Sequence, residues 1–550
     1  MICSNWCSDV EPNPEQERLA NLPIGNVLVI APAGCGKTEA LAARAQAVLA
    51  RGDVTAPRKV LALTFSNKAR ENLAARVRRV IGAGASQRIS VTNFHRLAAR
   101  VVRAHGSVVG IPKDIIFPED PWRKRQRREL GVNYKNGDEF ESALADAKRG
   151  TFDDAEVMDR LIAKGNDLAI AYEQRLRDEG RLDYDDLIRH GARVLAVPAV
   201  SQLYQAHFAM TMVDEVQDLS ILQYEMVRSV GGDAVTYAGD PAQGIYSFAG
   251  AEPVEVFTRI KSLDPEVVEF NLSYRSGPAV LKAVNALAGH MGMTELLCAN
   301  LEDWEDPGRV ISVERSDVDE EAAALLGYIA EISADPKVKI GVVHRGGKRV
   351  STIMGTAAKS GLAFEDWGLP THVPAVVDLI NREARQCLAA GGTDQEILLL
   401  LEDRCRALVE PGDADLLDEL AGACDVLRTL VADGQQLKAA IASCRASAEP
   451  GAPVAPGLHV LTAHKGKGQE FDWVFVIGLE EGVIPDFRTK DQEQFEEELR
   501  ILHVMVSRAR YGLVFSSIRT ITTQYGTKRE KDPSPWLDLL RLAATEVDHK

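Results

Sequence analysis

The residues at 31–38 have the types and the spacing to bind phosphate. They read Ala-Pro-Ala-Gly-Cys-Gly-Lys-Thr and stand between an apolar run and a helix-forming run. A strand, a glycine-rich loop and a helix that opens with Gly-Lys-Thr are typical of a P-loop, whose backbone N–H groups cradle phosphate oxygens. Lys37 would reach the β- and γ-phosphates of a nucleotide, and the Thr38 hydroxyl would hold Mg²⁺. A chance glycine-rich turn is the alternative, and Ala31 departs from the glycine that is usual at the first position.

A second group of chemically capable residues follows an apolar strand candidate. Residues 212–218 read Met-Val-Asp-Glu-Val-Gln-Asp. Asp214 could orient Mg²⁺ through water, and Glu215 could act as general base on the water that attacks a terminal phosphate. A surface acidic loop is the alternative, but apolar strands rarely run directly into Asp-Glu. Lys37 and Asp214 together therefore predict an enzyme that hydrolyses nucleoside triphosphates.

The elements that must position these residues alternate between strands and helices. This alternation predicts parallel sheets covered by helices on both faces. Ligands in such folds bind at the carboxyl ends of strands, where the P-loop and the acidic pair both fall. A mostly helical stretch at 95–194 interrupts the first block, and a helical insert at about 371–450 interrupts the second. The strand candidates are 26–30, 60–65, 210–213 and 234–238 in the first block, and 339–344, 459–461 and 474–477 in the second.

Length and composition limit the class of protein. With 550 residues, of which 45% are hydrophobic and 26% charged, the chain fits a globular protein of roughly three or four domains. No apolar run reaches the ~18–20 residues that span a bilayer, and the N-terminus lacks the regions of a signal peptide. We therefore expect a cytoplasmic protein with no membrane partner. The net charge of −16 argues against broad adhesion to nucleic acid. The net charge does not exclude a local basic groove, since salt screens charges beyond about 10 Å.

The eight cysteines are scattered and form no Cys-x-x-Cys pair, so we expect neither a disulfide framework nor a zinc site. Four of them recur at roughly 20-residue intervals in the helical insert. Buried cysteines on helices explain this spacing better than an iron–sulfur cluster, which uses shorter intervals. The eight are Cys3, Cys7, Cys35, Cys298, Cys387, Cys405, Cys424 and Cys444.

Seven further blocks stand in order around these two motifs, and together they resemble the UvrD/Rep family of superfamily 1 DNA helicases. A single block would be weak, but this number in the same order and spacing is specific, and it covers most of the chain. The resemblance implies an α/β fold of two RecA-like parallel-sheet P-loop domains with helical insertions, and ATP bound between the two domains. The blocks lie at 14–16, 63–69, 92–95, 239–248, 272–276, 462–471 and 496–509.

The resemblance implies which residues bind the nucleotide. Gln16 would hydrogen-bond adenine, Tyr274 would stack on it, and Glu470 would contact the ribose. Thr38 and Asp214 would hold Mg²⁺. The loop residues of the nucleotide site are Ala33, Gly34, Cys35, Gly36, Lys37 and Thr38.

The resemblance also implies how hydrolysis is assisted. Gln243 would sense the γ-phosphate, and Arg275 and Arg508 would act as arginine fingers. A guanidinium suits that role because it stabilises the charge of the phosphoryl-transfer transition state. The expected catalytic set is Lys37, Asp214, Glu215, Gln243, Arg275 and Arg508.

A surface for single-stranded DNA is implied as well. Phe65, Tyr246 and Phe248 would offer aromatic faces to bases, and such stacking contributes about 1–3 kcal/mol per base. For Phe65 and Phe248 a place in the hydrophobic core is the alternative. His464 and Lys467 would contact DNA from the second RecA-like domain. The full DNA-binding set is Thr64, Phe65, Asn67, His95, Tyr246, Phe248, His464 and Lys467.

Two features affect the expected grip on nucleic acid. Residues 122–128, Trp-Arg-Lys-Arg-Gln-Arg-Arg, form the densest basic run of the chain. They could follow duplex phosphates, or form a solvated helix face. Ala249 stands where the family usually has an arginine after the aromatic residue, and this departure removes one contact with the nucleic-acid chain.

The resemblance divides the chain into four parts. The last of them, 2B, is much smaller than in full-length relatives, and such a reduction occurs in phage, plasmid and defence-associated relatives, including the helicase-like subunit of Gabija systems. Its apolar residues have helical spacing and must be buried by self-packing, against the second domain or against a partner protein. Its acidic surface should repel duplex. The parts are 1–94 with 195–272 (domain 1A), 95–194 (insertion 1B), 273–370 with 455–550 (domain 2A) and 371–454 (insertion 2B).

These observations leave two main functions open. The first is an ATP-dependent helicase that moves 3′→5′ on single-stranded DNA and unwinds duplex, with the direction implied by the family alone. The second is a DNA-sensing ATPase subunit that controls a partner nuclease in DNA repair or antiviral defence and unwinds weakly by itself. A P-loop ATPase that acts on protein or small molecules is a third. The expected ligands are ATP, Mg²⁺ and DNA with single strands or duplex junctions.

Overall fold

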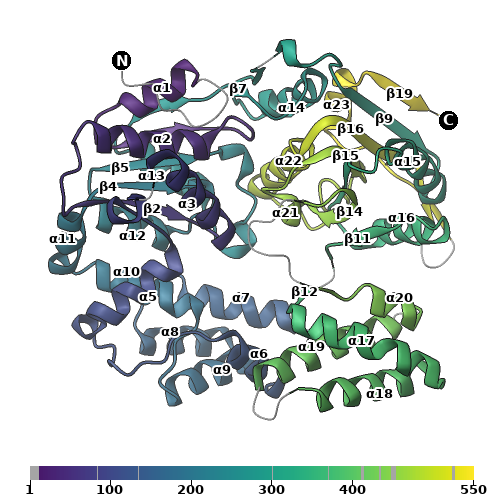
Figure 1. Ribbon diagram of the computed structural model, residues 1–550, viewed down its shortest axis with the longest axis horizontal. Helices are drawn as coiled ribbons and strands as arrows, with labels where there is room; N and C mark the ends of the chain where they lie inside the picture. Colours follow the sequence, from purple (N-terminus) through teal and green to yellow (C-terminus); the bar gives the residue numbers. More distant parts are fainter. Residues whose placement is uncertain are drawn as a thin grey trace.

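The computed structural model describes residues 12–82, 84–133, 136–299, 301–368, 371–409, 414–432, 435–446, 454–522 and 527–549. Cys3 and Cys7 lie outside these residues. Within the described part, two parallel sheets lie side by side, and two smaller helical bodies lie below them in the view of Figure 1. No helix among the described residues is long and apolar enough to cross a membrane.

The first sheet has six strands in the order β3-β2-β4-β5-β1-β6, and all neighbours pair in parallel. Its central strands are buried on both faces, which is why the sequence reads as continuous apolar runs rather than as alternation. Because the strands are parallel, the loops after β1 and β4 open at the same edge of the sheet. The strand order brings these two loops close together, since β1 and β4 lie on either side of β5. The strands are β1 (Val27–Ile30), β2 (Lys59–Thr64), β3 (Ile89–Asn93), β4 (Phe208–Asp214), β5 (Val235–Gly239) and β6 (Glu266–Glu269).

The second sheet has seven strands in the order β11-β14-β10-β15-β16-β9-β19, again all parallel. Two parallel sheets of this kind confirm the predicted α/β class with two RecA-like domains. The strands are β9 (Arg309–Arg315), β10 (Lys339–His344), β11 (Phe364–Asp366), β14 (Gly457–Thr462), β15 (Phe471–Ile477), β16 (Ala509–Ile518) and β19 (Glu546–His549). Two-stranded pairs join β7 (Leu272–Ser273) to β8 (Leu297–Cys298), β12 (Thr371–His372) to β13 (Arg445–Ala446) and β17 (Thr520–Thr522) to β18 (Lys528–Glu530).

Helices cover the faces of both sheets and bury their apolar sides there (Figure 1). Around the first sheet they are α1 (Pro14–Asn21), α2 (Lys37–Ala50), α3 (Asn67–Ile81), α4 (Ala85–Arg88), α5 (Phe94–His105), α10 (Tyr184–Leu195), α11 (Pro198–His207), α12 (Ile221–Gly231) and α13 (Pro253–Lys261). Around the second they are α14 (Pro278–His290), α15 (Val318–Ile332), α16 (Gly347–Lys359), α21 (Ala463–Gly466), α22 (Gln492–Val506) and α23 (Leu537–Ala543).

The first helical body lies next to the first sheet. Trp122, Phe140, Leu161 and Tyr172 are buried in its own core. α5 and α10, which flank it in the chain, instead bury their apolar faces in the core of the first sheet. These two helices therefore tie the body to that sheet. The body consists of α6 (Asp120–Glu129), α7 (Gly137–Lys148), α8 (Asp154–Lys164) and α9 (Asp167–Asp178).

The second helical body is the insert. Its helices bury their apolar residues in a core of their own, which is the self-packing alternative of the sequence analysis. Cys387, Cys405 and Cys424 are buried in that core on three successive helices, which accounts for their regular spacing. The parallel pair β12–β13 brings the two ends of the insert together. The body consists of α17 (Pro374–Ala390), α18 (Asp394–Ala407), α19 (Ala414–Ala432) and α20 (Leu437–Ala442).

The basic run at 122–128 lies on α6, the helix of the first helical body that contacts α19 of the insert. Arg123 and Arg127 both pair with Glu141 of α7, and the Lys124 ammonium pairs with Glu419 of α19. Much of this charge is therefore engaged within the protein, and the pair at Lys124 joins the two bodies.

Candidate functional site

The loop between β1 and α2 allows a ligand to approach the backbone closely. Gly34 and Gly36 have φ of +83° and +75°, a region that favours glycine. A Cβ on Gly34 would come within 2.7 Å of Arg275 Cβ, and a Cβ on Gly36 would come within 2.8 Å of Gln16 Nε2. Backbone conformation thus favours glycine at both positions, and at Gly34 lack of space requires it as well. Gly36, at the N-cap of α2, has no side chain that could cap the helix. The backbone N–H groups at the N-terminus of this 14-residue helix can therefore bind an anion.

The acidic pair at the end of β4 meets the P-loop lysine. Lys37 Nζ lies 3.0 Å from Asp214 Oδ1 and 2.7 Å from Glu215 Oε2. Burial alone would lower the pKa of the Lys37 ammonium, but the two carboxylates outweigh burial and raise it. Burial raises the pKa of Glu215, but Lys37, Lys467 and Gln217 together outweigh burial and lower this pKa to about 2. Lys37 is charged and Glu215 is ionised near neutral pH, the states that phosphate binding and general-base catalysis require.

The backbone and a neighbouring amide hold Glu215 in place. Glu215 has φ 59° and ψ 49°, an uncommon conformation for a residue other than glycine, and its N–H donates to Asp214 Oδ1 over 3.0 Å. The buried Gln217 donates from its amide nitrogen to Glu215 Oε2 and accepts from the Asp240 N–H over 3.0 Å. Gln217 belongs to the acidic motif, but the sequence alone gave no role to it. It positions the carboxylate of Glu215 against the end of β5.

The arginines of the second sheet reach the same cleft. Arg508 lies between α22 and β16, is buried, and donates from Nη2 to Gln243 Oε1 over 3.1 Å. Gln243 in turn donates to Asp240 Oδ2 over 2.6 Å. Burial and the neighbouring Arg275 lower the pKa of the Arg508 guanidinium to about 9. Two guanidinium groups held close in a buried cleft favour an anionic ligand between them.

Arg275 faces the P-loop from the chain segment after β7. Its Nη2 lies 2.5 Å from Glu470 Oε1, and its Nε is buried without a hydrogen-bond partner among the described residues. A buried donor of this kind usually has a ligand or a water as its partner. The side chain of Glu470 is 58% exposed, so a ribose could reach it.

The predicted adenine end is built on α1. Gln16 is buried, closes a capping box with Asn13 at the start of α1, and donates from Nε2 to the Cys35 carbonyl oxygen over 3.3 Å. Asn13 Nδ2 donates to the Tyr274 hydroxyl over 3.2 Å, and the Tyr274 N–H donates to the Gly34 carbonyl oxygen over 2.9 Å. Gln16, from α1, and Tyr274, from the segment after β7, therefore both contact the P-loop. The role of Asn13 was missed from the sequence, although an Asn three residues before Gln is a recognisable cap.

Four rings form an aromatic cluster where the two domains meet. Phe65 and Tyr246 stack with centroids 6.1 Å apart and planes at 13°. Phe248 meets His464 edge-on at 5.0 Å, and Tyr246 lies close to both. Phe248 is 70% exposed, which excludes the core alternative for that ring. Burial, Arg345 and Lys467 lower the pKa of His464 to about 4, so this ring is neutral at pH 7.

Three further residues of the expected DNA-binding set differ in exposure, since Thr64 is buried, His95 is half-buried and Asn67 is exposed. Thr64 is buried and its hydroxyl donates to the Ser66 carbonyl oxygen over 3.2 Å, while Asn67 Oδ1 accepts from Asn93 over 3.0 Å. His95 lines a cavity of about 550 Å³ together with Phe65. A DNA contact for these three side chains stays a prediction.

Lys467 is engaged within the protein, and its contact with DNA stays a prediction. Its ammonium lies 2.5 Å from Asp218 Oδ1, donates to the Gln243 carbonyl oxygen over 2.6 Å, and lies 4.6 Å from the Tyr246 ring centre. The side chain is only 7% exposed. Here Lys467 joins the second domain to the first, between the nucleotide cleft and the aromatic cluster. Asp218 belongs to the acidic motif, but the sequence pattern did not indicate this contact with Lys467.

Comparison with known proteins agrees with this geometry. The model of the UvrD/REP helicase N-terminal domain matches residues 12–263, and the model of the UvrD-like helicase C-terminal domain matches residues 440–520. The ATP-dependent DNA helicase UvrD2 of Mycobacterium tuberculosis is 28% identical over 579 residues, which cover 95% of this chain and 81% of that protein. UvrD1 of the same organism is 26% identical, with 92% and 82% covered. DNA helicase II of Haemophilus influenzae is 22% identical, with 92% and 83% covered.

Proposed function

The chain belongs to the UvrD/REP family of superfamily 1 DNA helicases, and on that premise we propose that it hydrolyses ATP to move 3′→5′ along single-stranded DNA and to unwind duplex. ATP-dependent helicase activity and ATP hydrolysis follow from the family. We propose the direction, the stepping along one strand and the roles of single residues.

The observation that carries the proposal is the meeting of two half-sites. Lys37, Asp214 and Glu215 come from the first sheet, and Arg508 comes from the second and touches Gln243 across the cleft. A triphosphate held by Lys37 and the loop amides would lie against both arginines. ATP would then tie the two domains together, and hydrolysis would release them.

Glu215 is the proposed general base. Its carboxylate is ionised, Gln217 donates to it, and the Asp214 side chain accepts from the Glu215 backbone N–H. Once a phosphate takes the place of the carboxylates beside Lys37, Glu215 is free to accept a proton from water. Arg275 and Arg508 would stabilise the charge that develops on the transferred group.

The donor set fits Mg²⁺. The Thr38 hydroxyl and the Asp214 carboxylate are hard oxygen ligands, and phosphate oxygens and waters would complete an octahedral shell. Burial raises the pKa of Asp214 despite the opposing effect of Lys37, and a divalent cation beside it would favour the ionised form. When bound, the ion neutralises charge on the β- and γ-phosphates.

The aromatic cluster is the proposed binding site for single-stranded DNA. Phe248 offers an open ring face, Tyr246 and His464 lie against this ring, and Phe65 stacks on Tyr246. Bases would stack there without regard to sequence. Lys467 connects Tyr246 to Asp218 and to Gln243. Movement of the aromatic cluster on DNA would therefore be transmitted to the nucleotide site.

The division into 1A, 1B, 2A and 2B is likewise proposed, with the first helical body in 1B and the insert as 2B. A DNA-sensing subunit that controls a nuclease is kept as the second candidate because the insert exposes Leu399 and Leu400, which a partner could cover. Repair, antiviral defence and a Gabija-type partner are predictions without a supporting contact.

Two measurements test the proposal. ATP hydrolysis is followed with and without an oligothymidylate, and the expected result is strong stimulation that Lys37→Ala abolishes. Unwinding is then followed on duplexes with a 3′ or a 5′ single-stranded tail. Unwinding of the 3′-tailed duplex alone supports the proposed direction, and a preference for the 5′ tail would overturn it. Hydrolysis that no DNA stimulates would overturn the DNA translocase itself.

A further inference from the structure

An arginine stands where two cavities meet beside the aromatic cluster. One cavity, of about 550 Å³, is lined by Phe65 and His95. The other, of about 830 Å³, is lined by Phe248 and His464. Arg149, directly after α7, lines both. A strand that passes from the open ring of Phe248 toward Phe65 would cross this point. The residues common to the two cavities are Ala145, Arg149, Asp185 and Ala249.

The guanidinium of Arg149 lies over the turn that carries Phe248. A Cβ built on Gly250 would come within 3.3 Å of Arg149 Nε and 3.4 Å of Nη2. Gly250 has φ +89°, so the turn needs glycine for its conformation as well. Ala249, the residue before it, has only a methyl group and leaves the guanidinium next to the cavity.

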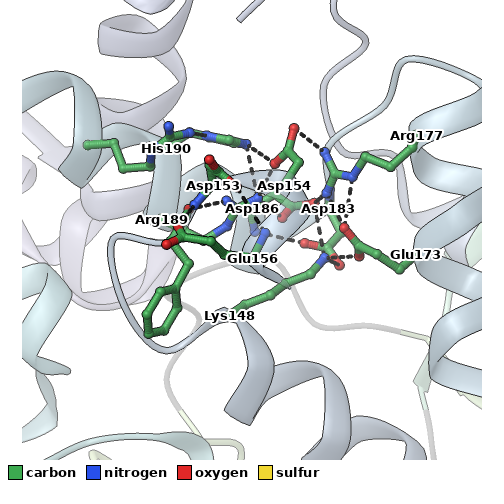
Figure 2. Close-up of polar contacts among 12 residues, drawn as sticks. Lys148, Asp153, Asp154, Glu156, Glu173, Arg177, Asp183, Asp186, Arg189 and His190 are labelled. Atoms are coloured by element: carbon green, nitrogen blue, oxygen red, sulfur yellow. Dashed lines mark hydrogen bonds and ion pairs between the residues drawn. The ribbon is translucent and has the colours of Figure 1, made fainter. Parts of the chain in front are cut away.

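A buried ion cluster fixes the backbone that carries Arg149. Lys148 is fully buried, and its ammonium lies 2.7 Å from Asp183 Oδ2, 2.8 Å from Glu173 Oε2 and 3.0 Å from Asp186 Oδ2 (Figure 2). Arg177 and Arg189 bind the same carboxylates from the other side (Figure 2). The cluster ties the end of α7 to α9 and to α10. Since α10 belongs to the core of the first sheet, the position of Arg149 relative to Phe248 is held by packing rather than by a free loop.

A phosphate can replace the carboxylate that pairs with Arg149. Its Nη1 lies 3.1 Å from Asp146 Oδ1, and the two side chains are 46% and 34% exposed. An exposed pair of this kind contributes little, so a phosphate can replace the carboxylate. The guanidinium has five N–H donors, and a phosphate can accept two of them side by side. Arg345 and Arg488 of the second cavity are engaged instead, with Glu498 and Asp486.

We propose that Arg149 binds a phosphate of single-stranded DNA between the Phe248 ring and the Phe65 cavity, and that it supplies from the first helical body the positive charge that Ala249 lacks. This inference rests on the proposed function, because it assumes that the strand follows the aromatic cluster. Arg149 is a DNA-binding residue in this proposal and takes no part in hydrolysis.

The test measures binding of a fluorescent oligothymidylate by anisotropy at several salt concentrations, with the full chain and without nucleotide. Arg149→Ala should weaken binding roughly ten-fold at low salt. The loss of one phosphate contact on a single strand should also reduce the slope of log K against log salt by about 0.7. Lys164→Ala is the matched control, because Lys164 pairs with the same Asp146 and lines neither cavity. It should bind like the unchanged protein, in affinity and in slope.

A second variant separates charge from fold. Arg149→Ala combined with Ala249→Arg moves the cation to position 249, which lines the same two cavities, and should restore affinity and slope. A double variant as weak as the single one would overturn the idea that Arg149 replaces a cation at position 249. Arg149→Gln keeps most of the bulk, and a normal affinity and slope in this variant would overturn the phosphate contact. If the unchanged protein binds no oligothymidylate, the proposed function itself is overturned. If only the Arg149 variants behave differently from the expectation, the role of Arg149 alone is overturned.

Discussion

The Arg508 guanidinium donates to Gln243 Oε1 over 3.1 Å and so connects the second sheet to the first. The two residues are 265 positions apart in the chain. Gln243 holds Asp240 on its other side, and Lys467 donates to the Gln243 carbonyl oxygen. Gln243 is therefore the point at which the nucleotide cleft, both sheets and the aromatic cluster meet.

Arg508→Ala should lower kcat for ATP by about a thousand-fold or more and leave much of the ATP affinity intact. The reason is that an arginine finger acts mainly on charge in the transition state. Steady-state hydrolysis with saturating oligothymidylate measures kcat and KM separately. Arg510→Ala, two residues further on and on the exposed side of β16, is the control and should turn over normally. An effect of Arg508→Ala on KM alone would contradict a role in the transition state.

Lys37→Ala and Glu215→Gln should both stop hydrolysis, for different reasons. Removal of Lys37 weakens phosphate binding, so the variant should not bind a fluorescent ATP analogue. Glu215→Gln should bind the analogue at least as well, because it removes a negative charge near the phosphates, and should lose about 10²–10⁴-fold in kcat. Glu255→Gln, an exposed pair partner of Arg259 on α13, serves as control. Near-normal turnover of Glu215→Gln would show that another group is the base.

Phe248→Ala should raise the oligothymidylate concentration that half-saturates ATPase stimulation by about 5- to 150-fold, equivalent to about 1–3 kcal/mol of stacking. Phe65→Ala should act in the same direction, and should also loosen Tyr246, on which it stacks. Leu542→Ala removes a similarly exposed apolar side chain far along the chain and should change nothing. If both aromatic variants keep the normal half-saturation, the cluster does not stack on bases.

Stability should fall as the pH drops below about 6.5, in part because of His464. Burial lowers the pKa of His464 in the folded protein to about 4, below the ordinary value of 6.5 in the unfolded chain. Between these two values the unfolded chain binds a proton that the folded protein does not, so protonation favours unfolding. Tm measured at pH 7.5 and 5.5 should fall less in His464→Gln than in the unchanged protein. An identical fall in both would show that His464 titrates normally when folded.

Deletion of residues 375–443 should preserve ATPase stimulation by single-stranded DNA. The insert has its own core, and the β12–β13 pair, which this deletion retains, already brings its two ends together for a short linker. The deletion also frees Lys124 from Glu419, so duplex affinity should stay the same or rise. Anisotropy with a labelled duplex and circular dichroism check the two points. A large loss of duplex affinity with the fold intact would mean that the insert grips duplex.

The sequence by itself determined the parts of the site that are contiguous in the chain. The glycines at 34 and 36 are required by local backbone conformation, and Lys37, Asp214 and Glu215 follow buried apolar strands that end at one edge of a parallel sheet. Local backbone geometry and short-range pattern are sufficient for such features. For this reason the α/β class and the approximate strand positions could also be predicted.

Tertiary structure alone decided which charges are engaged with one another. Nothing near Lys467 in the chain indicates that Asp218 takes its ammonium, and nothing near Arg127 indicates Glu141. Arg149 reaches the turn at Gly250 only because a buried ion cluster fixes the end of α7 against the first sheet. A side chain's type is a local property, but its partner depends on how distant elements pack, and a single sequence does not specify that packing residue by residue.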